Sequence, residues 1–110
     1  MNKNYTSVEQ SQKLIKFGIN KTTSDMHYDK HPLENYYSPI PIIGKYSEIH
    51  DQLPCWSLAA LLNVLPSATL DSSDDHHYRI HCMGRYTEWY DNAIDACYEM
   101  ILKLHELKNL

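Results

Sequence analysis

The sequence predicts an α+β fold, in which a small antiparallel sheet of about three strands packs against two main helices and an additional helix lies at the N-terminus. Three observations lead to this fold class. Apolar residues recur at helical spacing over residues 92–107, alternating segments flank a glycine over residues 78–90, and an apolar run of helical length lies between Pro54 and Pro66. The expected arrangement is α/β sandwich-like.

The length of the chain favours a single domain. Its 110 residues can bury enough apolar surface for one core without a disulfide or a metal. Within the domain, 1–110, we expect an N-terminal helical segment at residues 1–31, an extended arm rich in Pro and Tyr at residues 32–53, and a helix–sheet–helix core at residues 54–110.

The N-terminal segment carries two signals for the start of a helix. The pattern Thr6-Ser7-Val8-Glu9 resembles a capping box and predicts a helix over residues 7–17 that ends at Gly18. Asn20 is a second candidate cap, and it predicts a two-turn helix over residues 21–28.

Prolines at positions 32, 39, 41 and 54 exclude a helix from the arm. We expect one of two structures there. The first is an edge strand or short hairpin about Ile42-Ile43 and Tyr46-Ser47, and the second is an extended segment held across the core by its Ile and Tyr side chains.

The apolar run after the arm predicts a helix over residues 54–65, and residues 68–70 predict a third strand before a solvated turn at residues 71–76. Apolar residues surround nearly the whole helix, so we expect it to be the most buried element. Its main stripe consists of four leucines, Leu58, Leu61, Leu62 and Leu65.

The alternating segments predict a hairpin whose two-residue turn is Gly84-Arg85, with Gly first as a type II′ turn requires. In that register His81 faces Glu88 and Ile80 faces Trp89. The face expected toward the core carries Tyr78, Ile80, Cys82, Thr87 and Trp89. The face expected toward water or a partner carries Arg79, His81, Met83, Tyr86 and Glu88.

A long amphipathic helix is predicted to close the chain over residues 92–107. Asn92 is the expected N-cap, and Asp95 is expected to accept a bond from the backbone N–H of Asn92. The apolar stripe that should face the core consists of Ile94, Cys97, Ile101 and Leu104.

Charge and composition narrow the possible partners. The net charge is −4 and the ten Lys and Arg residues are scattered, which disfavours a nucleic-acid partner. The sequence lacks an apolar run near the ~20 residues of a membrane span and an apolar signal-peptide core, so we expect no membrane association and a cytoplasmic protein. The three cysteines are expected to be reduced and buried.

Few residue patterns indicate reaction chemistry. His27 and His31 have the spacing of a zinc-protease helix, but the Glu that should follow the first His is missing and Pro32 comes next, so we expect no metal site and no cofactor. Cys55 is the candidate nucleophile, because the dipole of a helix that starts beside it would favour a thiolate. The alternative is that Cys55 is a small buried hydrophobe under Trp56.

Three stretches of the sequence resemble a known group of proteins. They are Val8-Glu9-Gln10-Ser11-Gln12-Lys13-Leu14, Leu53-Pro54-Cys55-Trp56-Ser57-Leu58-Ala59-Ala60-Leu61-Leu62 and Asn92-Ala93-Ile94-Asp95-Ala96-Cys97-Tyr98-Glu99-Met100-Ile101-Leu102. They look like short uncharacterised proteins carried by phages, prophages and mobile elements of gut bacteria. The order of helix, antiparallel strands and helix is also similar to the phage ABA sandwich domain, in which helices cover both faces of a small sheet. Neither resemblance implies catalytic residues.

From these observations we expect a small non-enzymatic accessory or protein-interaction protein of phage or mobile-element origin, with no catalytic residue. Its expected contact surface carries His81, Met83, Tyr86, Glu88 and Tyr90, and one form of the expected contact is a self-complementary patch of a homodimer. Two alternatives stay open. The first is a thiol- or metal-dependent enzyme that uses Cys55, and the second is an inhibitor or anti-defence protein that covers a host partner.

Overall fold

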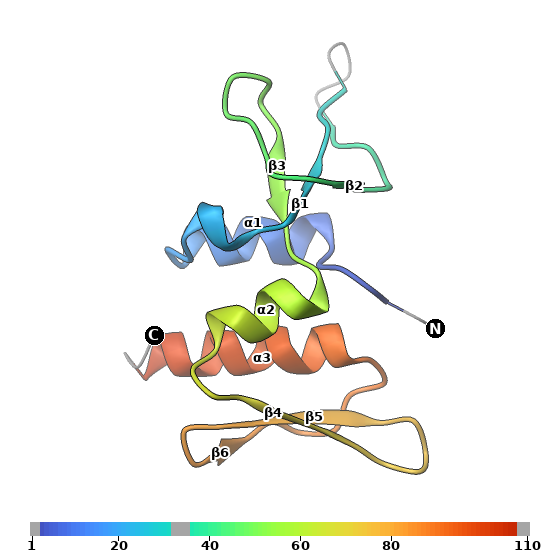
Figure 1. Ribbon diagram of the computed structural model, residues 1–110, viewed down its shortest axis with the longest axis vertical. Helices are drawn as coiled ribbons and strands as arrows, with labels where there is room; N and C mark the ends of the chain where they lie inside the picture. The colour runs from blue at the N-terminus through green and yellow to red at the C-terminus, as the bar shows by residue number, and fades with distance from the viewer. Residues whose placement is uncertain (1–2, 32–35, 108–110) are drawn as a thin grey trace.

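The computed structural model describes residues 3–31 and 36–107, which form an α+β fold as the sequence predicts. The helices are α1 (Val8–Lys16), α2 (Leu58–Val64) and α3 (Ala93–Glu106), with a short 3₁₀ helix η1 (Lys21–Thr23). The strands are β1 (Met26–Tyr28), β2 (Ile42–Ile43), β3 (Leu53–Cys55), β4 (Thr69–Ser72), β5 (Tyr78–Cys82) and β6 (Arg85–Tyr86). They form two antiparallel sheets at opposite ends of the molecule, with the helices between them (Figure 1).

Helix α1 confirms the predicted N-terminal helix and its end at Gly18, where φ is +87°. The capping box uses Ser7 and Gln10 rather than Thr6 and Glu9. Thr6 is instead fully buried, and its hydroxyl accepts a bond from the backbone N–H of Trp56. The start of α1 is therefore anchored to the middle of the chain.

The helix predicted over residues 21–28 is wrong beyond its first turn. Asn20 does cap η1, but the chain then leaves the helical conformation and forms β1. The hydroxyl of Thr23 donates to the Asn20 carbonyl, and that of Ser24 donates to the Lys21 carbonyl. Such short-range bonds compete with a helix, which explains why it ends after one turn.

The first sheet, in the order β2-β1-β3, was not predicted as a sheet. The arm supplies β2 as an edge strand, one of the two structures expected for it, but β2 pairs with β1 and not with Tyr46-Ser47. On the other side β3 pairs with β1, so that His27 lies opposite Pro54. Pairing between segments this far apart leaves no local sequence signal.

Helix α2 begins at Leu58, capped by Ser57, and not at Pro54 as predicted. Pro54 and Cys55 belong to β3. The prediction that this helix is the most buried element is also wrong, because its face at Ala59 is exposed and α3 carries more buried residues. Helix α2 packs on α3 and contacts η1, and its exposed residues are Ala59 and Asn63.

The second sheet confirms the predicted three-stranded meander, in the order β4-β5-β6. Its tight turn is formed by Met83 and Gly84, both with positive φ (52° and 76°). The predicted turn at Gly84-Arg85 is therefore wrong by one residue, and Tyr86 lies opposite His81. Positive φ at both central positions is the geometry of a type I′ turn, which matches the twist of a hairpin.

A bulge interrupts the meander after β6. The backbone N–H of Thr87 donates to the carbonyl oxygen of Ile80. Tyr90 and Tyr78 exchange two backbone hydrogen bonds. Between these two pairs, Glu88 and Trp89 both lie opposite the single residue Arg79. The Thr87 hydroxyl accepts the N–H of Ile80 where a ladder would use a carbonyl. The extra residue turns Trp89 outward, and the prediction that Trp89 faces the core is wrong.

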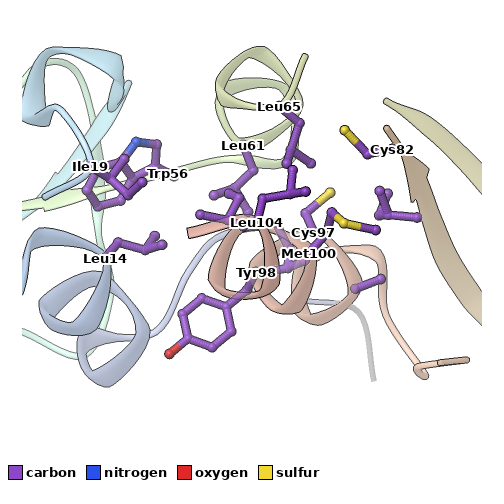
Figure 2. Packing of buried hydrophobic residues seen from close by; sticks show 14 of the residues in the cluster. Leu14, Ile19, Trp56, Leu61, Leu65, Cys82, Cys97, Tyr98, Met100 and Leu104 are labelled. Carbon is purple, nitrogen blue, oxygen red and sulfur yellow. The ribbon is translucent and has the colours of Figure 1, made fainter. Parts of the chain in front are cut away.

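Helix α3 lies between β5 and α2 (Figure 1), and it supplies more buried residues to the main core than any other element. Asn92 caps it as predicted, but the Asp95 carboxylate accepts from the Asn92 side chain and not from its backbone. Figure 2 shows Leu61 of α2, and Leu65 directly after this helix, beside Leu104 and Cys97 of α3. The core thus covers the inner face of the meander, where Ile80 and Cys82 point inward as predicted.

Candidate interaction surface

Four side chains are stacked in sequence on the outer face of the meander, and we call them the aromatic strip: His81, Tyr86, Arg79 and Trp89. The His81 and Tyr86 rings are nearly parallel, with centroids 4.2 Å apart. The Arg79 guanidinium carbon lies 4.4 Å from the Tyr86 ring centroid and 4.6 Å from that of Trp89. The stack therefore has a cation between two aromatic rings.

The local structure of the meander explains why these residues meet. Arg79 and His81 are two residues apart on β5, so both point away from the core side that holds Ile80. The Met83–Gly84 turn places Tyr86 opposite His81, and the bulge brings Trp89 over Arg79. Both features differ from the predicted hairpin, so the strip depends on the observed turn and bulge.

The charge of Arg79 is balanced within the face. Its Nε lies 3.1 Å from Oδ2 of Asp71 on β4, and the two side chains are equally exposed at 34%. A solvent-accessible, partly buried pair of this kind adds little to folding stability. It does fix the guanidinium plane against the rings and leaves this part of the face without a net charge.

The strip is open to solvent. The exposed fraction is 49% for Tyr86 and 46% for Trp89, and Met83 at the neighbouring turn is also exposed. No helix or strand of the part of the chain that the structure describes covers this side of the meander (Figure 1). Large aromatic side chains and Arg are enriched at protein interfaces, so the composition of the strip favours contact with a protein.

The residues predicted for the contact surface do not all lie together. His81 and Tyr86 belong to the strip and Met83 lies at the adjoining turn, but Tyr90 is partly buried and packs against the main core. His81 stacks on Tyr86 instead of facing Glu88, which lies in the bulge. The placement of Tyr90 on the outer face is therefore corrected to the core side.

Trp89 is the strip residue that the sequence reasoning placed wrongly. Strict alternation from Tyr86 puts Trp89 on the inner face, and one extra residue in the strand reverses that assignment. Residues 85–92 contain neither Gly nor Pro to signal the bulge. The alternation of the strand placed Arg79 on the correct face. Its position between the two rings depends on the bulge, and no sequence pattern indicated the bulge.

A groove of about 270 Å³ lies beside the strip, between the bulge and α3. Its lining includes three carboxylates, Glu88, Glu99 and Glu106. Burial raises the pKa of the Tyr90 hydroxyl in this groove, and the negative charges of Glu99 and Glu88 raise it further. Lys103 reaches the carbonyl oxygen of Tyr86 at 3.4 Å, so α3 also contacts the outer strand.

Cys55 does not lie at the start of a helix, as the thiolate argument required. It lies in β3 and is fully buried, with Sγ 3.4 Å from the carbonyl oxygen of Thr6. Burial raises the pKa of its thiol, although hydrogen bonds from Thr6 and Tyr28 act in the opposite direction. The thiol is therefore protonated at neutral pH, in an environment typical of a buried structural cysteine.

The described residues contain no group of three or more His, Cys, Asp or Glu side chains placed to hold a metal ion. His27, considered above for its spacing to His31, lies in strand β1 and not in a helix. Its Nδ1 atom is 2.8 Å from the carbonyl oxygen of Gly44.

Among the helices in residues 3–31 and 36–107, none combines the length and the apolar character needed to cross a membrane. Comparison with protein families, with curated proteins and with solved structures gives no match to this chain.

Proposed function

We propose that this chain is a small non-enzymatic accessory protein that binds a protein partner through the aromatic strip. The observation that supports the proposal is the stack itself: Tyr86 and Trp89 are about half exposed, yet each is held against Arg79. Side chains that are ordered before binding lose little conformational entropy when a partner covers them. A phage or mobile-element origin and a cytoplasmic location belong to the same proposal.

The electrostatics of the strip fit a protein partner. A buried cation without a counterion is costly, but Arg79 already has Asp71 at 3.1 Å and two rings around it. A partner can therefore desolvate the strip without leaving an unpaired charge. Exposed aromatic residues around such a pair resemble the centre of many protein interfaces, where a few residues carry most of the binding energy.

A second copy of the chain is the simplest partner. A two-fold axis through the strip would bring the same face of two molecules together, giving a homodimer with an isologous interface. An inhibitor or anti-defence protein would use the same surface to cover a host protein. The two versions differ in the partner, and the experiment below separates them.

The test combines sedimentation with affinity capture from host lysate, for the wild type and for Trp89→Ala and Tyr86→Ala. Removing a central aromatic residue from an interface costs about 2 kcal/mol, so we expect about a 30-fold loss of affinity. Tyr36→Ala is the matched control, because Tyr36 is 48% exposed and stacks on His31, at the other end of the molecule. Its affinity should be unchanged.

Concentration-dependent dimerisation that Trp89→Ala weakens would support the homodimer. A captured protein that Trp89→Ala and Tyr86→Ala lose, and Tyr36→Ala retains, would support a foreign partner, and loss of that partner's activity on binding would identify an inhibitor. A monomeric wild type that captures nothing dependent on the strip would contradict the proposal.

A further inference from the structure

Strand β4 forms one edge of the meander, and part of its backbone has no hydrogen-bond partner there. In an antiparallel pair, every second residue directs its N–H and C=O toward the neighbouring strand. The N–H of Ser73, directly after β4, bonds across to the segment that leads into β5, so Asp71 and Thr69 also face β5. Leu70 and Ser72 therefore direct their backbone groups away from the sheet, and no described residue bonds to these groups.

The other edge strands in the described part of the chain are shorter, and each has a feature that hinders pairing with a further strand. On β6, the Lys103 side chain reaches the carbonyl oxygen of Tyr86. Strand β2 follows Pro41 and β3 has Pro54 at its centre, and proline offers no N–H to a further strand. Proteins commonly protect their sheet edges in these ways. The four residues of β4 include neither proline nor lysine.

An open edge of this kind can pair with another extended strand, and β4 is complementary to itself. We propose that the β4 strands of two molecules pair antiparallel about a two-fold axis at Leu70, which joins the two meanders into one continuous sheet. In this register Leu70 bonds to Leu70 of the second copy, and Ser72 lies opposite Ala68 of the second copy. Each molecule supplies the backbone donors and acceptors that the other lacks.

The outer face of β4 fits this register. Thr69 lies opposite Asp71 of the second copy, where its hydroxyl can donate to the carboxylate, and the symmetry repeats this contact. The charge of Asp71 is already balanced by Arg79, whose Nε lies 3.1 Å from the carboxylate. An axis at Asp71 would instead place two carboxylates opposite each other, which is destabilising. The side chains therefore favour the axis at Leu70.

A cavity on the inner face provides space for the second leucine. Its volume is about 480 Å³, and its lining includes Leu58, Leu70 and Tyr78. The two side chains of a directly opposed pair lie on the same face of a sheet, so Leu70 of the second copy points toward this cavity. Leu70 is only partly buried in the single chain, and the pairing removes more of its apolar surface from water.

Disulfide cross-linking tests the register. In Leu70→Cys the two thiols meet at the axis, because the Cα atoms of such a pair lie about 5.5 Å apart, within the range of a disulfide. We expect this variant to form a covalent dimer under mild oxidation. Ser72→Cys is the matched control on the same face of β4, since its two Cα atoms would be about 13 Å apart and could not be bridged. The native cysteines are buried, so the wild type should not cross-link.

Sedimentation velocity over a range of concentrations measures the dimer itself. Ser72→Pro removes an outward N–H but keeps the bonds between Asp71 and β5, so it should remain folded. It should weaken dimerisation about tenfold, because the symmetry removes two hydrogen bonds. Trp89→Ala should dimerise as the wild type does, because the pairing leaves the aromatic strip open on the outer face of the joined sheet.

A wild type that stays monomeric at high concentration would overturn the proposal, and so would cross-linking of Ser72→Cys in place of Leu70→Cys. A dimer that Trp89→Ala weakens and Ser72→Pro does not would form through the aromatic strip. That result would contradict the β4 pairing and leave the proposed function intact. If Ser72→Pro does not fold, the two cysteine variants decide the question.

Discussion

At the level of single residues, several polar side chains of this protein act far from where their sequence position suggests. Thr6 looks like a helix cap, but it is fully buried and bonds to Trp56 and Ser11. Asp95 looks like a partner for the Asn92 backbone, but its carboxylate also binds Lys3 and the Gln10 side chain. Cap patterns therefore predicted the ends of helices well and the long-range partners of the same residues poorly.

The position of Asp95 predicts how stability depends on acid. Burial alone would raise the pKa of its carboxyl, but hydrogen bonds from Lys3, Asn92 and Gln10 outweigh it and hold the pKa below its ordinary value. A carboxyl group whose pKa is lower in the folded state than in the unfolded state stabilises the fold when it is ionised. This stabilisation is complete at pH values above the pKa in the unfolded state, near 4, and it is lost as the pH falls through the pKa in the folded state.

We therefore expect Asp95→Asn to be less stable than the wild type at neutral pH and to lose less stability on acidification from about pH 5 to 2. Urea midpoints at a series of pH values measure both effects. Asp74→Asn, in the exposed turn between β4 and β5, is the control and should follow the wild-type curve. An Asp95→Asn curve parallel to that of the wild type at every pH would contradict the assignment.

At the level of elements, the sequence predicted those that depend on nearby residues. Helix α3 and the meander follow from an apolar stripe, a cap and two alternating segments close together in the chain. The first sheet was missed because β1 pairs with β2 and β3, which are distant in sequence and only two and three residues long. The start of α2 was missed because Pro54 and Cys55 fit a helix start as well as they fit a strand.

Substitutions in the turn between β5 and β6 can distinguish the observed register, with Met83 and Gly84 in the turn, from the register with Gly84 and Arg85 in the turn. Met83 has a φ of 52°, which is unfavourable for a side chain of this shape, whereas Asn is common at the first position of a type I′ turn. We expect Met83→Asn to raise the free energy of unfolding by about 0.5–1 kcal/mol. Chemical denaturation measures the change.

Arg85→Asn is the comparison, because Arg85 is exposed, lies on the other side of the turn and is not among the residues with positive φ. It should give no gain. If Met83→Asn were neutral and Arg85→Asn stabilising, the turn would have to lie at Gly84-Arg85, as alternation alone suggests.

At the level of the whole molecule, the chain extends 44 Å along its longest axis, with a sheet at each end and helices between them. The main core nevertheless joins the two ends, since it includes Leu14 of α1 and Ile80 of β5. The sequence predicted helices packed on the meander, and this part was confirmed. The first sheet, β2-β1-β3, was not predicted, because the arm contains few residues that point into a core.

We expect the two ends to unfold together. Leu104 is fully buried near the middle of the core, so Leu104→Ala should cost about 2–5 kcal/mol. If the molecule is one cooperative unit, amide signals from β1 and from β5 should disappear at the same urea concentration, in the wild type and in this variant. Leu107→Ala, at an exposed leucine just after α3, should change the midpoint little. Two separate midpoints would show two independently folding halves.

The bulge opposite Arg79 has a consequence for how this protein can change over generations. An in-frame loss of the codon for Glu88 would remove the extra residue and leave Trp89 directly opposite Arg79, still on the outer face. The orientation of the indole would therefore survive this deletion as well as substitutions of Glu88. Selection on this loop should tolerate changes at position 88, in residue identity or in residue number, more readily than the loss of Trp89.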